Sequence, residues 1–551
     1  MHAGTLQQMD GTTTTRLVGG LDELRFDTRF TRELPADPEP TNRRHQVHDA
    51  AFSRVLPTPV AAPRTLAWSP EVAALLGIPP EVCASDDFAA VFAGNRVPVG
   101  ADPFAACYGG HQFGNWAGQL GDGRAIALGE VLDVEGHHQM LQLKGAGPTP
   151  YSRTADGRAV LRSSVREFLC SEAMFHLGVP TTRALSLVAT GDAVVRDMLY
   201  DGHPAAEPGA VVCRVAPSFT RFGTFQLPAS RGELTLLRTL VEFTIRNDFP
   251  HLRAEDFPTF EDQVAAWFVE VCERTAALAA HWMRVGFVHG VLNTDNMSIL
   301  GLTIDYGPYG WLESFDPNWT PNTTDAGMLR YKFGTQPEVC QWNLLQLAHA
   351  LLAMTEQPEP LQAGLDRYRT TYDQMFGTTF AARLGFGALR EGDGVLFEDL
   401  FTVLGVTETD YVLFFRLLAV VPVDPDATDD ELLGPLDEAW YRRTDLDAPS
   451  EAREAVLGWL RRWSARVRVG GLGDTERRRA MDGLNPRYVL RNYLAQEAID
   501  AAAQGDVRLL HELLDVLRSP YTDQPGRERF AARRPEWARE RVGCSMLSCS
   551  S

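Results

Sequence analysis

The sequence lacks the long apolar run that a membrane-spanning helix requires. Its most apolar stretch, 411–423, contains Arg416 and Pro422, whereas a membrane span needs about 20 consecutive apolar residues. The first twenty residues are polar and rich in threonine and glycine, without the apolar centre of a secretory signal. We therefore predict that 411–423 is a buried helix, that the protein is cytoplasmic, and that a membrane is not among its partners.

Paired cysteines and an excess of positive charge are also missing. The eight cysteines form no C-x-x-C pair, which argues against a zinc ribbon or a thioredoxin-type site. The formal net charge of −20 argues against nucleic acid as a partner, because binding to phosphate backbones needs a concentrated cationic surface. Most of the cysteines are expected to be buried. Cys544 and Cys549 lie in a polar tail of small residues, where we expect both sulfur atoms to be exposed.

The chain does contain a strand-rich segment followed by a helical one. Its 551 residues, 44% of them hydrophobic, can bury a large core. Short apolar runs alternate with glycine and proline turns from 108 to about 225, which predicts a twisted antiparallel sheet and one helix. From 236 onward apolar residues recur at helical spacing. This order predicts an α+β, bilobal protein-kinase-like fold with a strand-rich N-lobe, a helical C-lobe and helical C-terminal elaborations.

Four parts are predicted along the chain. Residues 1–20 are expected to be disordered, because they are polar and of low complexity. Residues 21–235 are expected to form the N-lobe with an N-terminal extension, and to bind the phosphates of a nucleotide. Residues 236–360 would form the helical C-lobe with the catalytic loop and metal site, and 361–551 a helical extension with the cysteine-containing tail.

A catalytic-loop pattern stands at 289–296, which reads His-Gly-Val-Leu-Asn-Thr-Asp-Asn, with Asp305-Tyr306-Gly307 after it. Protein kinases have H-R-D-x-x-x-x-N and then D-F-G; the first Asp accepts the substrate proton, and the Asn and the second Asp hold magnesium. His289 and Asn296 keep the kinase spacing, but Val291 stands at the position of the base. The pattern therefore predicts a nucleotide-binding protein whose chemistry differs from that of a kinase.

Lys144 ends the alternating segment 140–144, which is typical of a strand. A helix is predicted to follow, with Ser163 or Ser164 as its N-cap and Glu167 in its first turns. A lysine on the sheet and a glutamate on this helix can pair and fix the ammonium toward a nucleotide. Taken alone, the two residues could be a solvated strand end and a favourable charge near a helix N-terminus. The catalytic-loop pattern downstream favours the pair.

Glycines are concentrated between 108 and 124. Such a density lets backbone amides approach a polyphosphate closely, although glycine clusters more often form plain turns. The segment fits neither the P-loop nor the Rossmann pattern. Farther along, Arg214 and Arg221 carry guanidinium groups suited to bidentate phosphate binding; ordinary surface charge is the alternative interpretation for both.

Five motifs resemble the selenoprotein O family. They are Tyr-Gly-Gly-His-Gln-Phe-Gly at 108–114, Leu-Gly-Asp-Gly-Arg at 120–124, Lys-Gly-Ala-Gly-Pro-Thr-Pro-Tyr-Ser-Arg at 144–153, His-Gly-Val-Leu-Asn-Thr-Asp-Asn-Met-Ser at 289–298 and Asn-Pro-Arg-Tyr-Val-Leu-Arg-Asn-Tyr at 485–493. The resemblance covers roughly residues 45–551. Family members are kinase-like proteins that transfer AMP from ATP to Ser, Thr or Tyr hydroxyls of other proteins, with the nucleotide reversed relative to kinases. It therefore implies a protein adenylyltransferase that uses ATP with Mg²⁺, or alternatively Mn²⁺.

The resemblance also implies roles for individual residues. It implies ATP contacts at Gly121, Gly123, Arg124, Lys144, Asp156, Gly157, Arg214, Arg221 and Asp305. It implies that Asn296 and Asp305 hold magnesium and that Asp295 accepts the proton of the acceptor hydroxyl. Many relatives carry selenocysteine or cysteine third from the end, where this chain has Cys549, and in some of them it pairs with a cysteine after the magnesium aspartate. The segment 313–331 contains no cysteine, so a redox role of this tail would need Cys544, Cys340 or another partner.

Two other functions are compatible with the same patterns. One is a small-molecule or protein phosphotransferase of kinase-like fold, against which Val291 counts, because such enzymes also need an aspartate there. The other is a non-catalytic, nucleotide-binding pseudokinase, against which the retained lysine, glutamate and magnesium ligands count. The base pocket has no readable signature, so UTP stays open as a donor. We expect a monomer whose partners are ATP and protein substrates.

Overall fold

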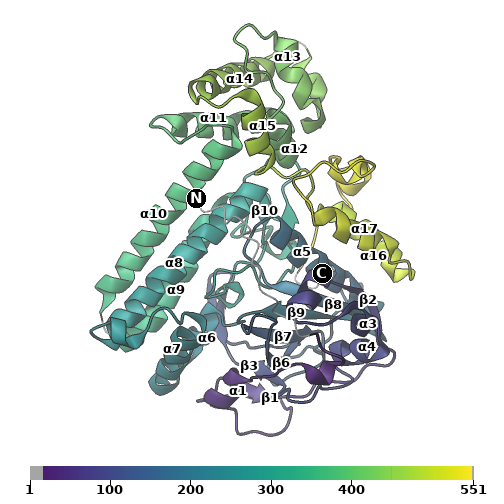
Figure 1. The fold of residues 1–551 in the computed structure, drawn as a ribbon, viewed down its shortest axis with the longest axis vertical. Coiled ribbons are helices and arrows are strands. Elements are labelled where there is room, and N and C mark those ends of the chain that lie inside the picture. Colours follow the sequence, from purple (N-terminus) through teal and green to yellow (C-terminus); the bar gives the residue numbers. More distant parts are fainter. Residues whose placement is uncertain (1–16, 356, 448, 549–551) are drawn as a thin grey trace.

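The structure is a computed structural model that describes residues 17–355, 357–447 and 449–548 (Figure 1). Its strands are β1 (Phe52–Arg54), β2 (Arg64–Trp68), β3 (Phe104–Ala106), β4 (Gly109–Gln112), β5 (Asn115–Gln119), β6 (Ala125–Leu132), β7 (His138–Lys144), β8 (Arg183–Arg196), β9 (Ala205–Ala216), β10 (Phe287–Val288) and β11 (Gly310–Trp311). Its α-helices are α1 (Arg29–Glu33), α2 (Pro70–Leu75), α3 (Pro80–Cys83), α4 (Asp86–Ala93), α5 (Leu161–His176), α6 (Phe222–Arg231), α7 (Leu234–Asp248), α8 (Phe260–Val285), α9 (Gln336–Thr355), α10 (Pro358–Arg383), α11 (Asp393–Leu404), α12 (Tyr411–Leu418), α13 (Asp429–Leu433), α14 (Glu451–Val469), α15 (Asp474–Asp482), α16 (Asn492–Ala503) and α17 (Arg508–Leu517). The fold is α+β, as predicted.

A seven-stranded antiparallel sheet forms the lower part of the molecule in Figure 1, with strand order β1-β3-β6-β7-β9-β8-β2. Strands β7 and β9 pair Gln142 with Arg214 and Lys144 with Val212. Because alternate residues of a strand share a face, the side chains of Gln142, Lys144 and Arg214 project from the same face of the sheet. The prediction of an antiparallel sheet in this part of the chain is confirmed.

The two faces of the sheet pack against different helices. Leu141 and Leu143, which alternate with the polar residues of β7, belong to a core cluster with Phe88 and Phe92 of α4. Met140 on the opposite face belongs to the larger core that includes Leu169 of α5. The polar side chains Gln142 and Lys144 therefore lie on the face that α5 covers, between the sheet and the helical part of the chain.

The remainder of the chain is mainly helical. Figure 1 shows α8, α9 and α10 alongside one another on the left, and the contacts between α8 and α10 are extensive. Helix α8 follows the N-cap residue Thr259, whose side chain accepts the N–H of Asp262, and is capped at its C-terminus by Gly286 with φ +73°. The helical spacing predicted from 236 onward is confirmed by α7, α8, α9 and the helices that follow. The boundaries predicted after 235 and 360 stay predictions.

The C-terminal motif at 485–493 ties the last helices to the rest of the chain. Arg491 forms a buried two-bond ion pair with Asp410, at 2.8 and 3.0 Å. The amide of Asn492 donates to the Cys544 carbonyl at 2.7 Å, and the Leu547 N–H donates to the Pro321 carbonyl at 3.0 Å. The tail therefore lies against the segment that follows Asp305.

Several sequence-based expectations were wrong. Val18 is buried and donates its N–H to Gly77 at 2.9 Å, so residues 17–20 are ordered against the core; residues 1–16 lie outside the described part. Helix α5 begins after Val160, because that residue is extended in a bridge with Gly209, so neither predicted serine is the N-cap. Cys544 is buried, since its segment packs against Asn492.

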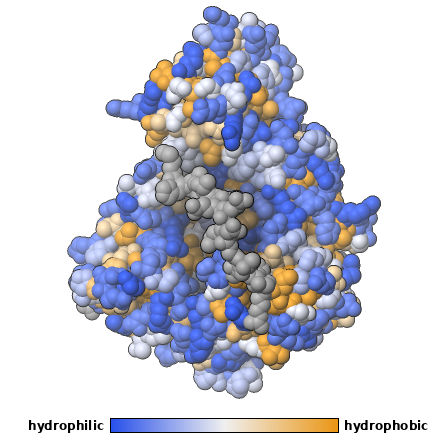
Figure 2. Space-filling model, in the orientation of Figure 1, coloured by the Kyte–Doolittle hydropathy of each residue, from blue (hydrophilic) through white to orange (hydrophobic). Residues whose placement is uncertain are grey.

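Cys549 lies outside the described residues. In the part of the chain that is described, no helix is long and apolar enough to cross a bilayer. The stretch predicted as a buried helix forms α12, in which Arg416 is also buried. The face drawn in Figure 2 is mainly hydrophilic, with apolar residues in scattered patches.

Candidate active site

A cavity of about 560 Å³ lies between the sheet and the catalytic loop. Among the residues that line it are Gly121, Gly123, Arg124, Lys144, Gly157, Arg214, Asp295, Asn296 and Asp305. Several strands and loops of the strand-rich part therefore meet the segment 291–308 at one site, although they are far apart in the sequence. Of the other predicted residues, Glu167 and Arg221 are buried next to the cavity-lining side chains, and Asp156 lies beside the lining residue Arg196.

Asp305 is surrounded by three cations. Its carboxylate forms ion pairs with Arg214, with Arg221 at 2.8 Å and with Lys144 at 3.4 Å. Burial acts to raise the pKa of Asp305, but the three cations outweigh it and hold that pKa well below its usual value. The carboxylate is consequently ionised at all ordinary pH values. Glu167 also contacts two of these cations, so three cations face two carboxylates, and the remaining positive charge suits a polyphosphate.

The predicted pair of Lys144 and Glu167 is present, with 2.5 Å between Nζ and Oε2. Both side chains are buried, and Arg214 also contacts Glu167 at 3.2 Å. Burial lowers the pKa of Lys144, and the attraction of Glu167 and Asp305 opposes that shift. Glu167 therefore keeps the ammonium charged and directed toward the cavity.

The backbone of Asp305 is in the left-handed region, with φ +59°. That conformation is uncommon for a residue with a side chain and persists only where the surroundings enforce it. Here the Asp305 carbonyl accepts the Gly307 N–H at 2.9 Å, and the carboxylate is held by the arginines. The tight turn is what brings this carboxylate into the cavity, opposite the sheet.

Asp295 is the second acidic group of the cavity and lies in a different environment. Gln112 of β4 donates to its Oδ2 at 3.2 Å, while no described residue provides a hydrogen bond to its buried Oδ1. Burial raises the pKa of Asp295 to about 6. Arg221 binds the backbone carbonyl of Asp295 at 2.7 Å, which fixes the loop without neutralising the carboxylate. A carboxyl group with this pKa can accept and release a proton near neutral pH.

The catalytic loop is held by its own polar side chains. His289 donates from Nε2 to the Ile304 carbonyl at 3.0 Å, and burial lowers its pKa, so the ring is neutral. Asn296 donates from Nδ2 to the Val291 carbonyl at 2.9 Å, which leaves its amide oxygen available. Val291, which stands at the sequence position of the kinase base, lines the cavity.

Two oxygen donors in the cavity suit a divalent cation: the amide oxygen of Asn296 and the carboxylate of Asp305. Magnesium prefers oxygen ligands, and one or two protein oxygens together with substrate phosphates are usual. Because both oxygens of Asp305 already contact cations, a metal ion would share this carboxylate with the arginines until phosphates arrive. The donor set therefore fits a metal that enters together with its nucleotide.

The predicted glycines allow close packing of two loops at the rim of the cavity. Gly121 has φ +83°, and a Cβ at Gly123 would lie 2.9 Å from the Tyr151 carbonyl. Gly157 has φ +72°, and a Cβ there would lie 2.2 Å from the Gly147 carbonyl. Asp156 pairs with Arg196 at 2.6 Å. No side chain other than hydrogen would fit between these loops.

The sequence patterns indicated no role for Asp122, a buried carboxyl group that Gln142 connects to Arg214. Asp122 accepts hydrogen bonds from Gln142 at 3.1 Å and from the Tyr108 hydroxyl at 3.2 Å, and Gln142 in turn accepts one from Arg214. Burial raises the pKa of Asp122. Gln142 lies two residues before Lys144 on the same strand, and this spacing alone predicts that the two side chains share a face of the sheet.

Comparison with known proteins gives concordant results. A family model described as "Protein adenylyltransferase SelO" matches residues 40–518. The chain is 59% identical over 535 residues to a protein of Aromatoleum aromaticum, an alignment that covers 96% of this chain and 100% of the relative. It is 60% identical over 530 residues to a protein of an Azoarcus species, covering 96% and 99%, and 57% identical over 541 residues to one of Rhodopirellula baltica, also covering 96% and 99%. All three relatives are named "Protein nucleotidyltransferase YdiU". With a matching model over most of its length and full-length relatives at this identity, the chain belongs to the SelO family of protein adenylyltransferases.

Proposed function

We propose that this nucleotidyltransferase, with a bilobal kinase-like fold, transfers AMP from ATP to Ser, Thr or Tyr hydroxyls of other proteins and releases pyrophosphate. The observation that carries the proposal is the cluster of three buried cations, Lys144, Arg214 and Arg221, around Asp305. A cluster this rich in cations matches the terminal phosphates of ATP, which carry most of its charge.

The buried cluster supports a reversed nucleotide. If Arg214 and Arg221 bind the γ-phosphate, the α-phosphate lies farther out, nearer to the acceptor. Asp295 lines the same cavity and has no arginine on its carboxylate. In this orientation the acceptor hydroxyl lies near Asp295 and away from Val291. A side chain without a proton acceptor is therefore tolerated at position 291.

The reaction follows from these roles. The acceptor hydroxyl oxygen forms a bond to the α-phosphorus, the bond from that phosphorus to the oxygen bridging to the β-phosphate breaks, and the hydroxyl proton goes to Asp295. Lys144, Arg214 and Arg221 stabilise the charge that develops on pyrophosphate. Asn296 and Asp305 would hold Mg²⁺, which supplies charge neutralisation on the phosphates when it is bound. Orientation of the reacting groups contributes the remainder of the rate.

The test uses ATP that carries label at either the α or the γ position, with purified protein and a mixture of acceptor proteins. Label from the α position should become covalently attached, with one pyrophosphate released for each AMP, and γ-label should not. Asp305→Ala serves as the inactive control, and α-labelled UTP in a parallel reaction reports whether the donor is restricted to ATP. Attachment of γ-label alone would indicate a phosphotransferase. Attachment of neither label would indicate a nucleotide-binding protein without transfer activity.

A further inference from the structure

Arg330 is a cation near the active site whose charge no ion pair compensates within the described residues. Its guanidinium lies over the Trp342 ring, with 4.4 Å between Cζ and the ring centroid. Within the described part of the chain it forms no ion pair, and its buried Nε and Nη2 have no hydrogen-bond partner. By contrast Lys144, Arg214 and Arg221 are all paired with carboxylates. The charge of Arg330 is therefore not compensated by an ion pair with a nearby carboxylate, which favours an anionic ligand at this place.

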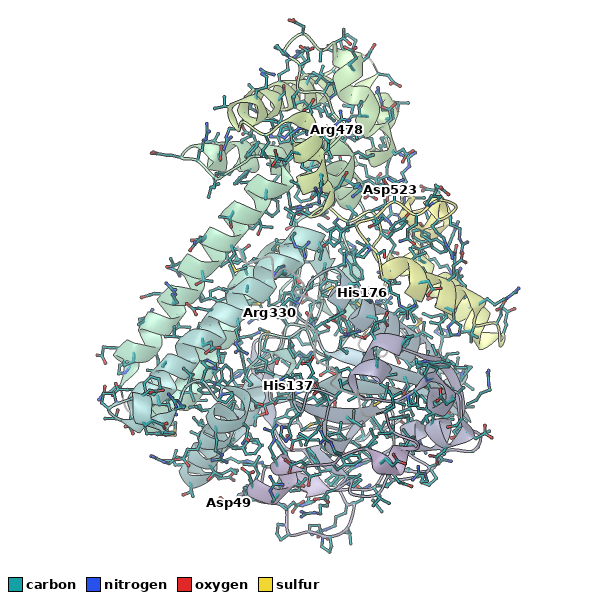
Figure 3. The ribbon with its side chains drawn as sticks, viewed as in Figure 1. Asp49, His137, His176, Arg330, Arg478 and Asp523 are labelled. Carbon is teal, nitrogen blue, oxygen red and sulfur yellow. The ribbon has the colours of Figure 1, made fainter. Side chains whose placement is uncertain are left out.

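The tip of the β4–β5 hairpin connects Arg330 to Asp295. Gln112 on one side of the tip donates to the Asp295 carboxylate at 3.2 Å. On the other side, a Cβ at Gly114 would lie 3.3 Å from the Arg330 Cζ. Since an extended chain advances about 3.3 Å per residue, a polypeptide with its hydroxyl at Asp295 would bring a residue only a few positions away to Arg330. Figure 3 places Arg330 near the middle of the molecule, between the long helices and the strands.

Aromatic and apolar side chains surround this cation. The His111 ring lies between the rings of Trp116 and Trp342, with centroids 5.0 and 5.5 Å apart. Trp116 is 40% exposed and Met328, two residues before Arg330, is 65% exposed. His111 is fixed to the catalytic loop, because its N–H donates to Thr294 Oγ1 at 2.7 Å. A cation within an exposed aromatic surface is the composition that protein-binding sites favour.

We propose that Arg330, Trp116 and Met328 form the docking site for the acceptor polypeptide, in which Arg330 binds an Asp or Glu side chain close to the modified hydroxyl. The proposal rests on the proposed function, because it names the acceptor sequence that the same active site selects. The Nη1 group, which unlike Nε and Nη2 is not among the buried unpaired atoms, can donate a charge-assisted hydrogen bond to a carboxylate. The chain has a net charge of −20, so a local cation is what would let an acidic segment approach.

The experiment uses a peptide library with one central acceptor hydroxyl and mixed acidic, basic and neutral residues at each flanking position. Wild-type protein and α-labelled ATP should label peptides that carry Asp or Glu at one or two defined flanking positions, enriched on the order of tenfold. Arg330→Gln should remove the enrichment, Arg330→Lys should keep part of it, and Arg330→Glu should replace it with enrichment of Lys or Arg. Lys332→Gln, which removes a positive charge two residues away, should leave it unchanged.

The change in midpoint of thermal unfolding on addition of Mg-ATP separates a docking defect from a folding or nucleotide-binding defect. All variants should show the wild-type shift. Labelling by wild-type protein without an acidic preference, or the same preference in Arg330→Gln, would overturn this inference and leave AMP transfer standing. Absence of α-label from every peptide and every protein acceptor would instead reject the transfer activity, and the inference with it.

Discussion

Gly110 is in direct contact with the carboxylate of Asp295: a Cβ atom at Gly110 would lie 2.7 Å from Oδ1 and 2.9 Å from Cβ of the aspartate. The backbone of Gly110 is outside the left-handed region, so glycine is needed there for space. Strand β4 therefore shapes the pocket in which Asp295 is buried.

We expect Gly110→Ala to reduce turnover about 100-fold, because a displacement of the order of 1 Å in a reacting group has effects of that size. The affinity for ATP should change much less, since Gly110 does not line the cavity. Steady-state kinetics with α-labelled ATP gives both quantities. Gly458→Ala in α14, where an added Cβ meets nothing within 4 Å, is the matched control. Wild-type turnover in Gly110→Ala would show that the position of Asp295 does not matter.

The pH dependence of transfer should report Asp295. Burial raises its pKa to about 6, and only the ionised carboxylate can accept a proton. The value of kcat/KM should therefore fall as the pH decreases through about 6, by about tenfold per unit below that point. The raised pKa of Asp295 also affects the stability of the fold. Because the folded state holds this proton more tightly than the unfolded state, protonated Asp295 contributes favourably to the free energy of unfolding at low pH. This contribution is lost as the pH rises through 6. A pH profile that is flat between 5 and 7 would remove Asp295 from the proton transfer.

Asp305 should be required for both chemistry and stability. Asp305→Asn removes the carboxylate that contacts all three cations of the cluster, and loss of one partner from a buried ion pair costs about 3–5 kcal/mol. We expect no detectable AMP transfer and a lower free energy of unfolding in urea. Mg-ATP should restore part of the stability, because its phosphates supply new anionic partners. Asp506→Asn, at an exposed pair with Arg508, should leave both properties unchanged.

Much of this site could be predicted from the sequence, because many of its residues belong to short motifs with characteristic spacing. The positions of Lys144, Asn296 and Asp305 each depend on a strand end or a turn within a few residues, which local patterns describe. The roles of Asp122, Gly110 and Arg330 depend on contacts between segments far apart in the chain, and no local pattern encodes them. The wrong expectation for Cys544 has the same cause. Its tail is polar, yet contacts with Asn492 and Pro321 bury it.

The ion pair of Arg491 and Asp410 should stabilise the C-terminal helices. Both side chains are buried, and Asp410 also caps α12 by accepting the Leu413 N–H at 3.0 Å. Arg491→Met would leave a buried carboxylate without its cation and should lower the free energy of unfolding by about 3–5 kcal/mol. Urea unfolding followed by circular dichroism measures the change. The double variant Asp410→Asn, Arg491→Met should recover part of the lost free energy of unfolding, because the uncompensated charge is then gone. No recovery would mean that the pair contributes through packing and not through charge.

Cys549 should not take part in nucleotide transfer, although it lies outside the described residues. All the described cysteines are buried, and none of the described residues that line the cavity contains sulfur. A thiol intermediate would need a sulfur atom at the α-phosphate, and no described residue that lines the cavity supplies one. Cys549→Ser should keep AMP transfer within a few-fold of wild type under reducing conditions, while its response to mild oxidant should differ, because a terminal thiol can be oxidised. Transfer assays with and without oxidant, followed by mapping of disulfide-linked peptides, test both statements. If reduced Cys549→Ser were inactive, a covalent thiol step would have to replace direct attack by the acceptor hydroxyl.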